Sequence, residues 1–275
     1  MNTIVITDPN DDRLADFRAL NDQSLRRKIE SDEFFIAEGY VAIERLIESG
    51  HVVRSVLLAP SRVSRFERHL DSLAAAGIPV YVAERETIAE IVGFDMHRGV
   101  IAAAERERHP GLKELASTSS RMAVLEGLND AENLGAIARA ARAFGIDGLV
   151  IDWRCTDPYS RRTVRVSMGE VLFLPIVRIA EEDWPAAFDM LESADFETWA
   201  MTPRPEATNL WSMVAPDRLA VIFGAEGPGL AERTMAASSR RVRIPIRPEV
   251  DSLNVGHAAA ITFAALTRPT ISAQT

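Results

Sequence analysis

The feature that most constrains the fold is a series of six short apolar runs in the second half of the chain. Continuous apolar runs of this kind are typical of parallel strands that are covered on both faces. Stretches with helical spacing alternate with them, which predicts an α/β fold with a mostly parallel sheet and helices on both sides. The predicted strands are MAVLEG, GLVIDW, VLFLPIV, FETWAM, LAVIFG and VRIPI, and the predicted helices span 133–144, 160–168, 183–194, 229–238 and 254–267.

The first half of the chain alternates in the same way and predicts a second compact α/β unit. Residues 11–29 place apolar side chains at roughly helical spacing. The stretch FFIAEGYVAIERLIESG then indicates a strand, a turn and an amphipathic helix that ends at Gly50. Three further strands are expected in VVRSVLLAP, IPVYVAE and GVIAAAE, separated by helices in RFERHLDSLAAAG and ETIAEIVG.

A polar stretch separates the two halves. Residues 105–121 contain a Pro-Gly pair and no strong apolar period, which indicates a linker. We therefore expect a smaller domain over 1–108, a linker over 109–120 and a second domain over 121–275.

The net charge of −9 argues against broad binding to nucleic acid. Nearly all cationic residues are arginines, however, and several cluster in SLRRK and SRRTVR. Guanidinium groups suit phosphate, so the clusters are either local phosphate-binding sites or solvated helix faces. Any binding to nucleic acid is then expected to be local.

The single cysteine, Cys155, excludes an internal disulfide and a cysteine-based zinc site. This is the pattern of a reducing cytoplasm. We expect no membrane span, because no run is long or apolar enough, and no secretory signal, because the N-terminus lacks a basic region followed by an apolar stretch.

Three predicted strands end in unusual polar loops, where ligands of open α/β sheets usually bind. The first loop, in LEGLNDAENLGAIARAARAFG, leads into a helix that carries Arg139 among alanines and Ile137. Asn129 or Asp130 can simply cap this helix. Capping does not explain Arg139, because an arginine on so apolar a helix either snorkels or serves a site.

The second loop, in LAVIFGAEGPGLAE, has glycines at 224, 227 and 229 around Glu226. Glycines allow backbone N–H groups to approach a ligand closely. The spacing is neither that of a dinucleotide fingerprint nor that of a P-loop, which disfavours a nucleotide-dependent dehydrogenase. The third loop follows VRIPI and places Ser252, Leu253 and Asn254 at a helix start, where Ser252 or Asn254 can also act as an N-cap.

In this order and spacing, over roughly residues 121–267, the three loops resemble the SpoU (TrmH-like) family of RNA ribose 2′-O-methyltransferases, of the SPOUT class. The first family motif resembles Asn133, Gly135 and Arg139, the second FGAEGPGL, and the third IPI followed by SLNV. The N-terminal part resembles an L30e-like substrate-binding domain through FFIAEGYVAIERLIESG and MHRGVIAA. His97-Arg98-Gly99 stands where the family often has His-Gln-Gly.

The resemblance implies a C-terminal trefoil knot, a homodimer in which each chain completes the other's active site, and S-adenosylmethionine as methyl donor. No metal is implied. The resemblance places the donor on the backbone of four residues: Gly224, Gly229, Ile244 and Leu253.

The same resemblance implies catalytic roles for five residues. Arg139 is expected to act as a cation that binds the adjacent phosphate and stabilises the developing alkoxide, with phosphate or water taking the proton. Asn133 and Glu226 are expected to position Arg139 and the ribose, and Ser252 and Asn254 to orient the catalytic side chains. His257 is more simply explained as a histidine on a helix face than as a base.

RNA is the expected partner, and the L30e-like unit favours ribosomal RNA over transfer RNA. Three alternatives remain: a tRNA ribose methyltransferase, a base methyltransferase, and a non-catalytic RNA-binding protein of ribosome assembly. The candidate RNA-binding residues are Arg26, Arg98, Arg161, Arg162 and Arg165.

Overall fold

The computed structural model describes residues 3–30, 33–96 and 98–266, and the chain divides into two compact units. Unit 1 is made of Met1–Glu107 and Tyr159–Leu172, and unit 2 of Arg108–Pro158 and Phe173–Thr275. His97, part of the His97-Arg98-Gly99 stretch in the L30e-like match, and the last residue of the predicted helix 254–267 lie outside the described residues.

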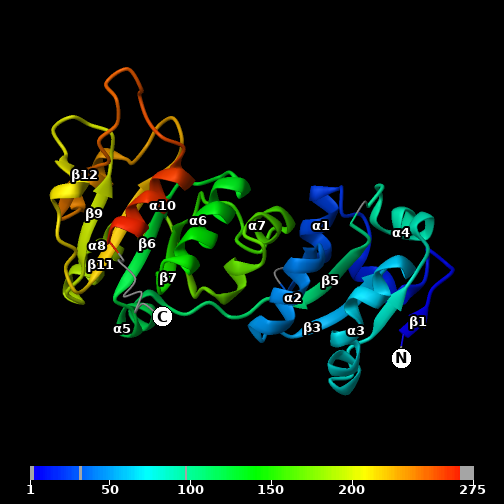
Figure 1. Ribbon diagram of the computed structural model, residues 1–275. Coiled ribbons are helices and arrows are strands. Elements are labelled where there is room, and N and C mark those ends of the chain that lie inside the picture. Colours follow the sequence, from blue (N-terminus) through cyan, green and yellow to red (C-terminus); the bar gives the residue numbers. More distant parts are fainter. Residues whose placement is uncertain (1–2, 31–32, 97, 267–275) are drawn as a thin grey trace, which may run out of the picture. The chain divides into compact units, whose positions relative to one another are not determined.

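Unit 1 contains a five-stranded sheet in the order β1-β4-β3-β5-β2 (Figure 1). β1, β4 and β3 run parallel, while β5 is antiparallel to both β3 and β2. All five residues of β2 are buried, because both faces of this strand are covered. The strands are β1 (Thr3–Val5), β2 (Phe34–Glu38), β3 (Val53–Leu58), β4 (Val80–Val82) and β5 (Val100–Glu105).

The helices of unit 1 follow the predicted pattern with one correction. The helical spacing over 11–29 is not one helix: a 3-10 helix and α1 share it, with Ala19 between them at φ 54°. A left-handed residue cannot continue a right-handed helix. The helices are η1 (Asp12–Phe17), α1 (Gln23–Glu30), α2 (Tyr40–Ser49), α3 (Pro60–Ala75), α4 (Arg85–Val92) and α7 (Arg161–Val166).

Unit 2 contains a seven-stranded sheet in the order β10-β12-β9-β11-β6-β7-β8, in which all neighbouring strands are parallel (Figure 1). The predicted mostly parallel α/β fold is therefore confirmed. The strands are β6 (Arg121–Glu126), β7 (Gly148–Asp152), β8 (Ile176–Ile179), β9 (Glu197–Met201), β10 (Thr208–Asn209), β11 (Leu219–Gly224) and β12 (Arg240–Arg243).

The predicted strand VLFLPIV is wrong in its first half. Glu170–Phe173 forms a 3-10 helix, η2, and β8 begins only at Ile176. Pro175 has no N–H to give to a ladder, and its carbonyl accepts the first bond to this edge, from the Leu149 N–H at 2.9 Å. The apolar run therefore serves two elements rather than one.

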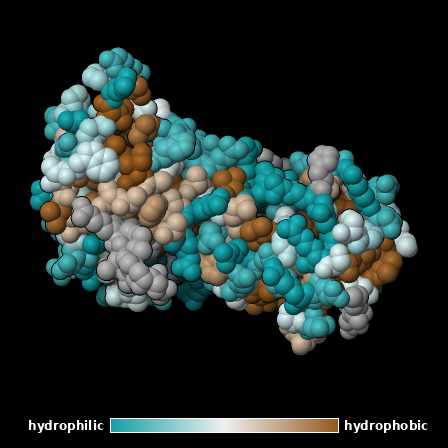
Figure 2. All heavy atoms as spheres, viewed as in Figure 1, coloured by the Kyte–Doolittle hydropathy of each residue, from teal (hydrophilic) through white to brown (hydrophobic). Residues whose placement is uncertain are grey.

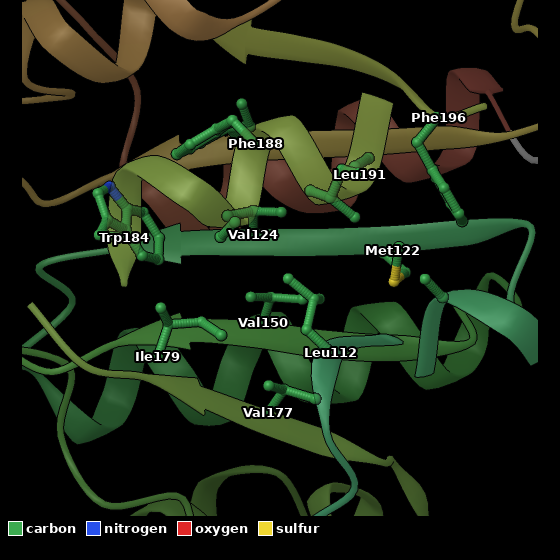
Figure 3. Packing of buried hydrophobic residues seen from close by; sticks show 14 of the residues in the cluster. Leu112, Met122, Val124, Val150, Val177, Ile179, Trp184, Phe188, Leu191 and Phe196 are labelled. Atoms are coloured by element: carbon green, nitrogen blue, oxygen red, sulfur yellow. The ribbon is translucent and has the colours of Figure 1, made fainter. Parts of the chain in front are cut away.

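The predicted linker 109–120 also needs correction, because it contains a helix that belongs to the core of unit 2. Leu112 and Leu115 of α5 are buried in a cluster with Met122 and Val150 (Figure 3). Two apolar residues three positions apart are too few to show a helical period in the sequence. The helices of unit 2 are α5 (Leu112–Thr118), α6 (Ala131–Ala143), α8 (Trp184–Ser193), α9 (Glu232–Ala237) and α10 (Val255–Leu266), with a 3-10 helix η3 (Leu210–Ser212).

Helix α10 packs closely on α6. A Cβ atom at Gly256 would lie 3.2 Å from the Cβ atom of Ala136, so the two helices approach through small residues. The Phe263 ring lies edge-on to the Phe223 ring of β11, with centroids 5.6 Å apart. The buried residues of α10 are Val255, Gly256, Ala259, Thr262 and Phe263. In the part of the chain that the structure describes, no helix is long and apolar enough to cross a membrane.

Candidate active site

The second and third polar loops meet at the carboxyl end of the sheet of unit 2. They line a pocket of about 480 Å³ with one wall from the residues that follow β9. The pocket is mixed in character, because apolar side chains alternate with short polar ones and with glycine backbone. All four predicted donor-binding residues lie in its wall: Gly224, Gly229, Ile244 and Leu253.

Gly224 is required by the way the second loop folds back on its own strand. A Cβ atom at this position would lie 2.3 Å from the carbonyl carbon of Gly229 and 2.4 Å from the nitrogen of Leu230. The Gly229 N–H donates to the carbonyl of Ala225 at 3.0 Å, and Gly229 has φ 69°. Only glycine allows this approach and this conformation, which explains the recurrence of glycines after β11.

A hydrogen-bonded group joins all three loops. The side-chain amide of Asn254 donates to Oδ1 of Asn133 at 2.8 Å and to Oε1 of Glu226 at 2.5 Å. Asn133 is buried, whereas Glu226 and Asn254 are exposed at the pocket. Three residues that are distant in the sequence, and that were assigned to one site, are thus brought together.

Both alternative capping roles are also present. Oδ1 of Asp130 accepts from the N–H of Glu132 at 2.8 Å and caps α6. Oδ1 of Asn254 accepts from the N–H of His257 at 3.2 Å near the start of α10. Asn254 therefore caps a helix and links the loops with the same side chain. Ser252 lies in the pocket wall and is exposed.

Arg139 does not take part in this group. Its side chain is exposed on α6, and it makes no hydrogen bond or ion pair with any residue within the described ranges. Asn133 and Glu226 bond to Asn254 instead. Among the described residues neither side chain bonds to Arg139, so the expectation that they position it stays a prediction.

An ion network beside the first loop was not anticipated. Arg154 donates from Nε to Oδ2 of Asp152 at 2.8 Å and from Nη2 to Oε1 of Glu126 at 3.0 Å. Both carboxylates are fully buried at the ends of β7 and β6. Burial by itself lowers the pKa of Arg154, but the hydrogen bond to Asp152 and the two negative charges raise it overall. The sequence feature that could have predicted this ion network is the acidic residue at the end of each of two neighbouring strands.

All five candidate RNA-binding arginines lie in unit 1, and four of them are exposed or partly buried. Arg98 and Arg162 are exposed, and Arg161 and Arg165 are partly buried. Arg161 Nε and Arg165 Nη1 lie 3.5 and 3.7 Å from Oε2 of Glu38. Burial lowers the pKa of Arg161, against the attraction of Glu38.

Arg26 is the exception and its assignment is corrected. It is only 6% exposed, and its guanidinium donates to Oε1 of Glu30 at 2.7 Å and to the carbonyl of Asp16 at 2.8 Å. The group also lies over the ring of Phe34. A guanidinium that is satisfied inside the unit is not available to a phosphate, so Arg26 has a structural role.

Comparisons with known proteins agree on one family. Residues 120–264 match the model of the SpoU rRNA Methylase family, and residues 36–110 match a model described as RNA 2′-O ribose methyltransferase substrate binding. An uncharacterized tRNA/rRNA methyltransferase of Mycobacterium tuberculosis is 39% identical over 267 residues, which cover 96% of this chain and 91% of the relative. A 23S rRNA (guanosine-2′-O-)-methyltransferase of Haemophilus ducreyi is 27% identical over 84% of this chain and 93% of its own length.

The crystal structure of an AdoMet-bound rRNA methyltransferase from Sinorhizobium meliloti is similar over 99% of this chain and 100% of that chain, with a TM-score of 0.81 and 25% identity. The fold and the site thus define an S-adenosylmethionine-dependent RNA methyltransferase with a separate substrate-binding unit. Since the methylase model covers more than half of its length, the chain belongs to the SpoU rRNA methylase family.

Proposed function

We propose that this enzyme methylates a ribose 2′-hydroxyl of ribosomal RNA. The observation that carries the proposal is the pocket at the carboxyl end of the unit 2 sheet, lined by Glu226 and Asn254 of the hydrogen-bonded group that also contains Asn133. The relatives named for 23S rRNA and rRNA support ribosomal over transfer RNA. A tRNA ribose methyltransferase is the second candidate, because the M. tuberculosis relative is named for both substrates.

The pocket suits the methyl donor in size and chemistry. Ile244 and Leu253 supply apolar surface for an adenine ring, and backbone N–H and C=O groups suit its polar edge. Gly224 keeps side-chain atoms out of the place where the second loop turns. When bound, S-adenosylmethionine supplies a methyl group on a positively charged sulfur. The carboxylate of Glu226 lines the same pocket and favours a cation there.

The remaining side chains would have two roles: some position the ribose, and Arg139 stabilises the charge that develops on it. Asn254 holds Asn133 and Glu226 in fixed positions, so the ribose would meet a rigid polar edge. Ser252 offers an exposed hydroxyl in the pocket wall. The guanidinium of Arg139 would bind the phosphate next to the reacting ribose and stabilise the developing alkoxide. Phosphate or water would then accept the proton.

The homodimer and the trefoil knot belong to this proposal. An exposed Arg139 with no ion pair in the described part of the chain suits a site that a second copy completes. Trp211 and Val214 of unit 2 are exposed apolar side chains, and on the face in Figure 2 apolar areas interrupt a mainly hydrophilic surface. A cytoplasmic location and a reaction without a metal stay predictions.

Transfer of labelled methyl from S-adenosylmethionine to total RNA from a strain lacking the gene tests the proposal. We expect label in one rRNA species, as an alkali-resistant ribose methyl, and its loss in Arg139→Ala. Label in a tRNA would favour the second candidate. Measurable donor binding without label in any RNA or ribosomal particle would favour the assembly-protein alternative, and absence of donor binding would refute the enzyme itself.

A further inference from the structure

The segment Tyr159–Leu172 comes from the middle of the methylase part of the sequence, yet it packs on unit 1. The Tyr159 ring stacks on Phe35 of β2 with centroids 4.7 Å apart. A Cβ atom at Gly169 would lie 2.5 Å from the Cβ atom of Arg45 on α2, so glycine is needed for this approach. The substrate-binding unit therefore has a wall that the N-terminal sequence alone does not supply.

This segment closes a second cavity, of about 300 Å³, which lies entirely in unit 1. Its wall combines one acidic residue, the two aromatic rings of Tyr40 and Phe66, and four arginines. The polar residues among them are Glu38, Tyr40, Arg62, Arg65, Arg98 and Arg165. Hereafter the cavity that these six residues line is called the arginine cavity.

Glu38 is the unusual member of the arginine cavity. The residue is 6% exposed, and the nearest cationic nitrogens, on Arg161 and Arg165, are 3.5 and 3.7 Å from Oε2. No hydrogen bond reaches its carboxylate from any residue in 3–30, 33–96 or 98–266. A carboxylate offers about four acceptor positions, and the two ion pairs to Oε2 leave positions on the Glu38 carboxylate open to a donor. A ligand with N–H donors in the cavity would bond to them.

The arginines carry more positive charge than Glu38 can balance. The guanidiniums of Arg62 and Arg98 make no ion pair with a described residue. Arg65 lies over the ring of Tyr40, with its central carbon 3.9 Å from the ring centroid. Free guanidiniums suit a phosphate, and a planar guanidinium or aromatic surface suits an unstacked base.

We infer that the arginine cavity binds one unpaired nucleotide of the RNA substrate, with its phosphate on Arg62 and Arg98 and its base edge on Glu38. Guanine suits the carboxylate best, because it presents two adjacent N–H donors. This inference rests on the proposed RNA methyltransferase function and adds the nucleotide class that the substrate-binding unit selects. The selection would fix the position of the RNA before methyl transfer.

The test compares the full-length enzyme with Arg98→Ala and Glu38→Gln, and uses Arg85→Ala as matched control. Arg85 is exposed in unit 1, pairs with Asp95 and lies outside the cavity wall. The probe is labelled rRNA from a strain lacking the gene. We expect Arg98→Ala to weaken binding about tenfold and to lower the salt slope by about 1, while Arg85→Ala stays within about twofold of wild type.

Competition by free nucleotides tests which base the arginine cavity prefers at Glu38. GMP is expected to displace the labelled rRNA at lower concentration than AMP, and Glu38→Gln is expected to remove that difference while leaving donor affinity unchanged. If both cavity variants behave like Arg85→Ala while the wild type methylates RNA, the inference is wrong. If the wild type methylates no RNA, the proposed function fails instead. Because Arg98 is exposed, its replacement tests the cavity even where Glu38→Gln folds poorly.

Discussion

Replacing Gly224 with alanine gives the sharpest test of the donor pocket. The new Cβ atom would lie 2.3 Å from the carbonyl carbon of Gly229 and 2.6 Å from its oxygen. Both are backbone atoms, so a rotamer change cannot relieve the clash. The second loop must move by roughly 1 Å to restore ordinary contact, and a misplacement of that size can reduce a rate by about 100-fold.

Two consequences of this displacement are measurable. The free energy of unfolding is expected to fall by about 1–3 kcal/mol, as for other overpacked sites. The dissociation constant for S-adenosylmethionine is expected to rise at least tenfold, equivalent to about 1.4 kcal/mol. Isothermal titration calorimetry measures the dissociation constant, and urea denaturation measures the free energy of unfolding.

Gly111→Ala is the matched control, because Gly111 is the N-cap residue before α5 of the same unit and a Cβ atom there would meet nothing within 4 Å. Its donor affinity should equal that of the wild type. The reasoning is refuted if Gly224→Ala binds the donor as tightly as Gly111→Ala does and methylates RNA at the same rate.

Three further predictions concern other parts of the chain. Asn254→Ala removes the bonds to Asn133 and Glu226; we expect a loss of about 1–2 kcal/mol in unfolding free energy and weaker donor binding, and unchanged values for both would contradict the linking role. Burial lowers the pKa of His51 from 6.5 despite the nearby Glu107, so its contribution to stability is present above pH 6.5 and is lost as the pH falls through the lowered value; denaturation of His51→Phe should lack this loss. Burial and the charge of Asp152 raise the pKa of Cys155 to about 12, so a thiol reagent at pH 8 should label it only after unfolding, and rapid labelling of the native protein would show an accessible thiolate.

Local patterns in the sequence were enough to predict the layered α/β fold, whereas the donor pocket was predicted from the resemblance of its loops to known motifs. A buried parallel strand needs a continuous apolar run, and a backbone that approaches itself needs glycine; both requirements act on neighbouring residues and are therefore visible in a single sequence. Gly224, Ile244 and Leu253 were assigned through the resemblance of their loops to known motifs, and all three line one pocket.

Tertiary packing alone decided which charged residues are available to bind a ligand. Arg26 and Arg98 are indistinguishable as sequence positions, but one is enclosed by acceptors and the other is exposed. The pairing of Asn254 with Asn133 joins loops more than a hundred residues apart. The segment 159–172 leaves the methylase sequence to pack on unit 1. Contacts of this kind depend on which surfaces meet after folding, and no local period or composition records them.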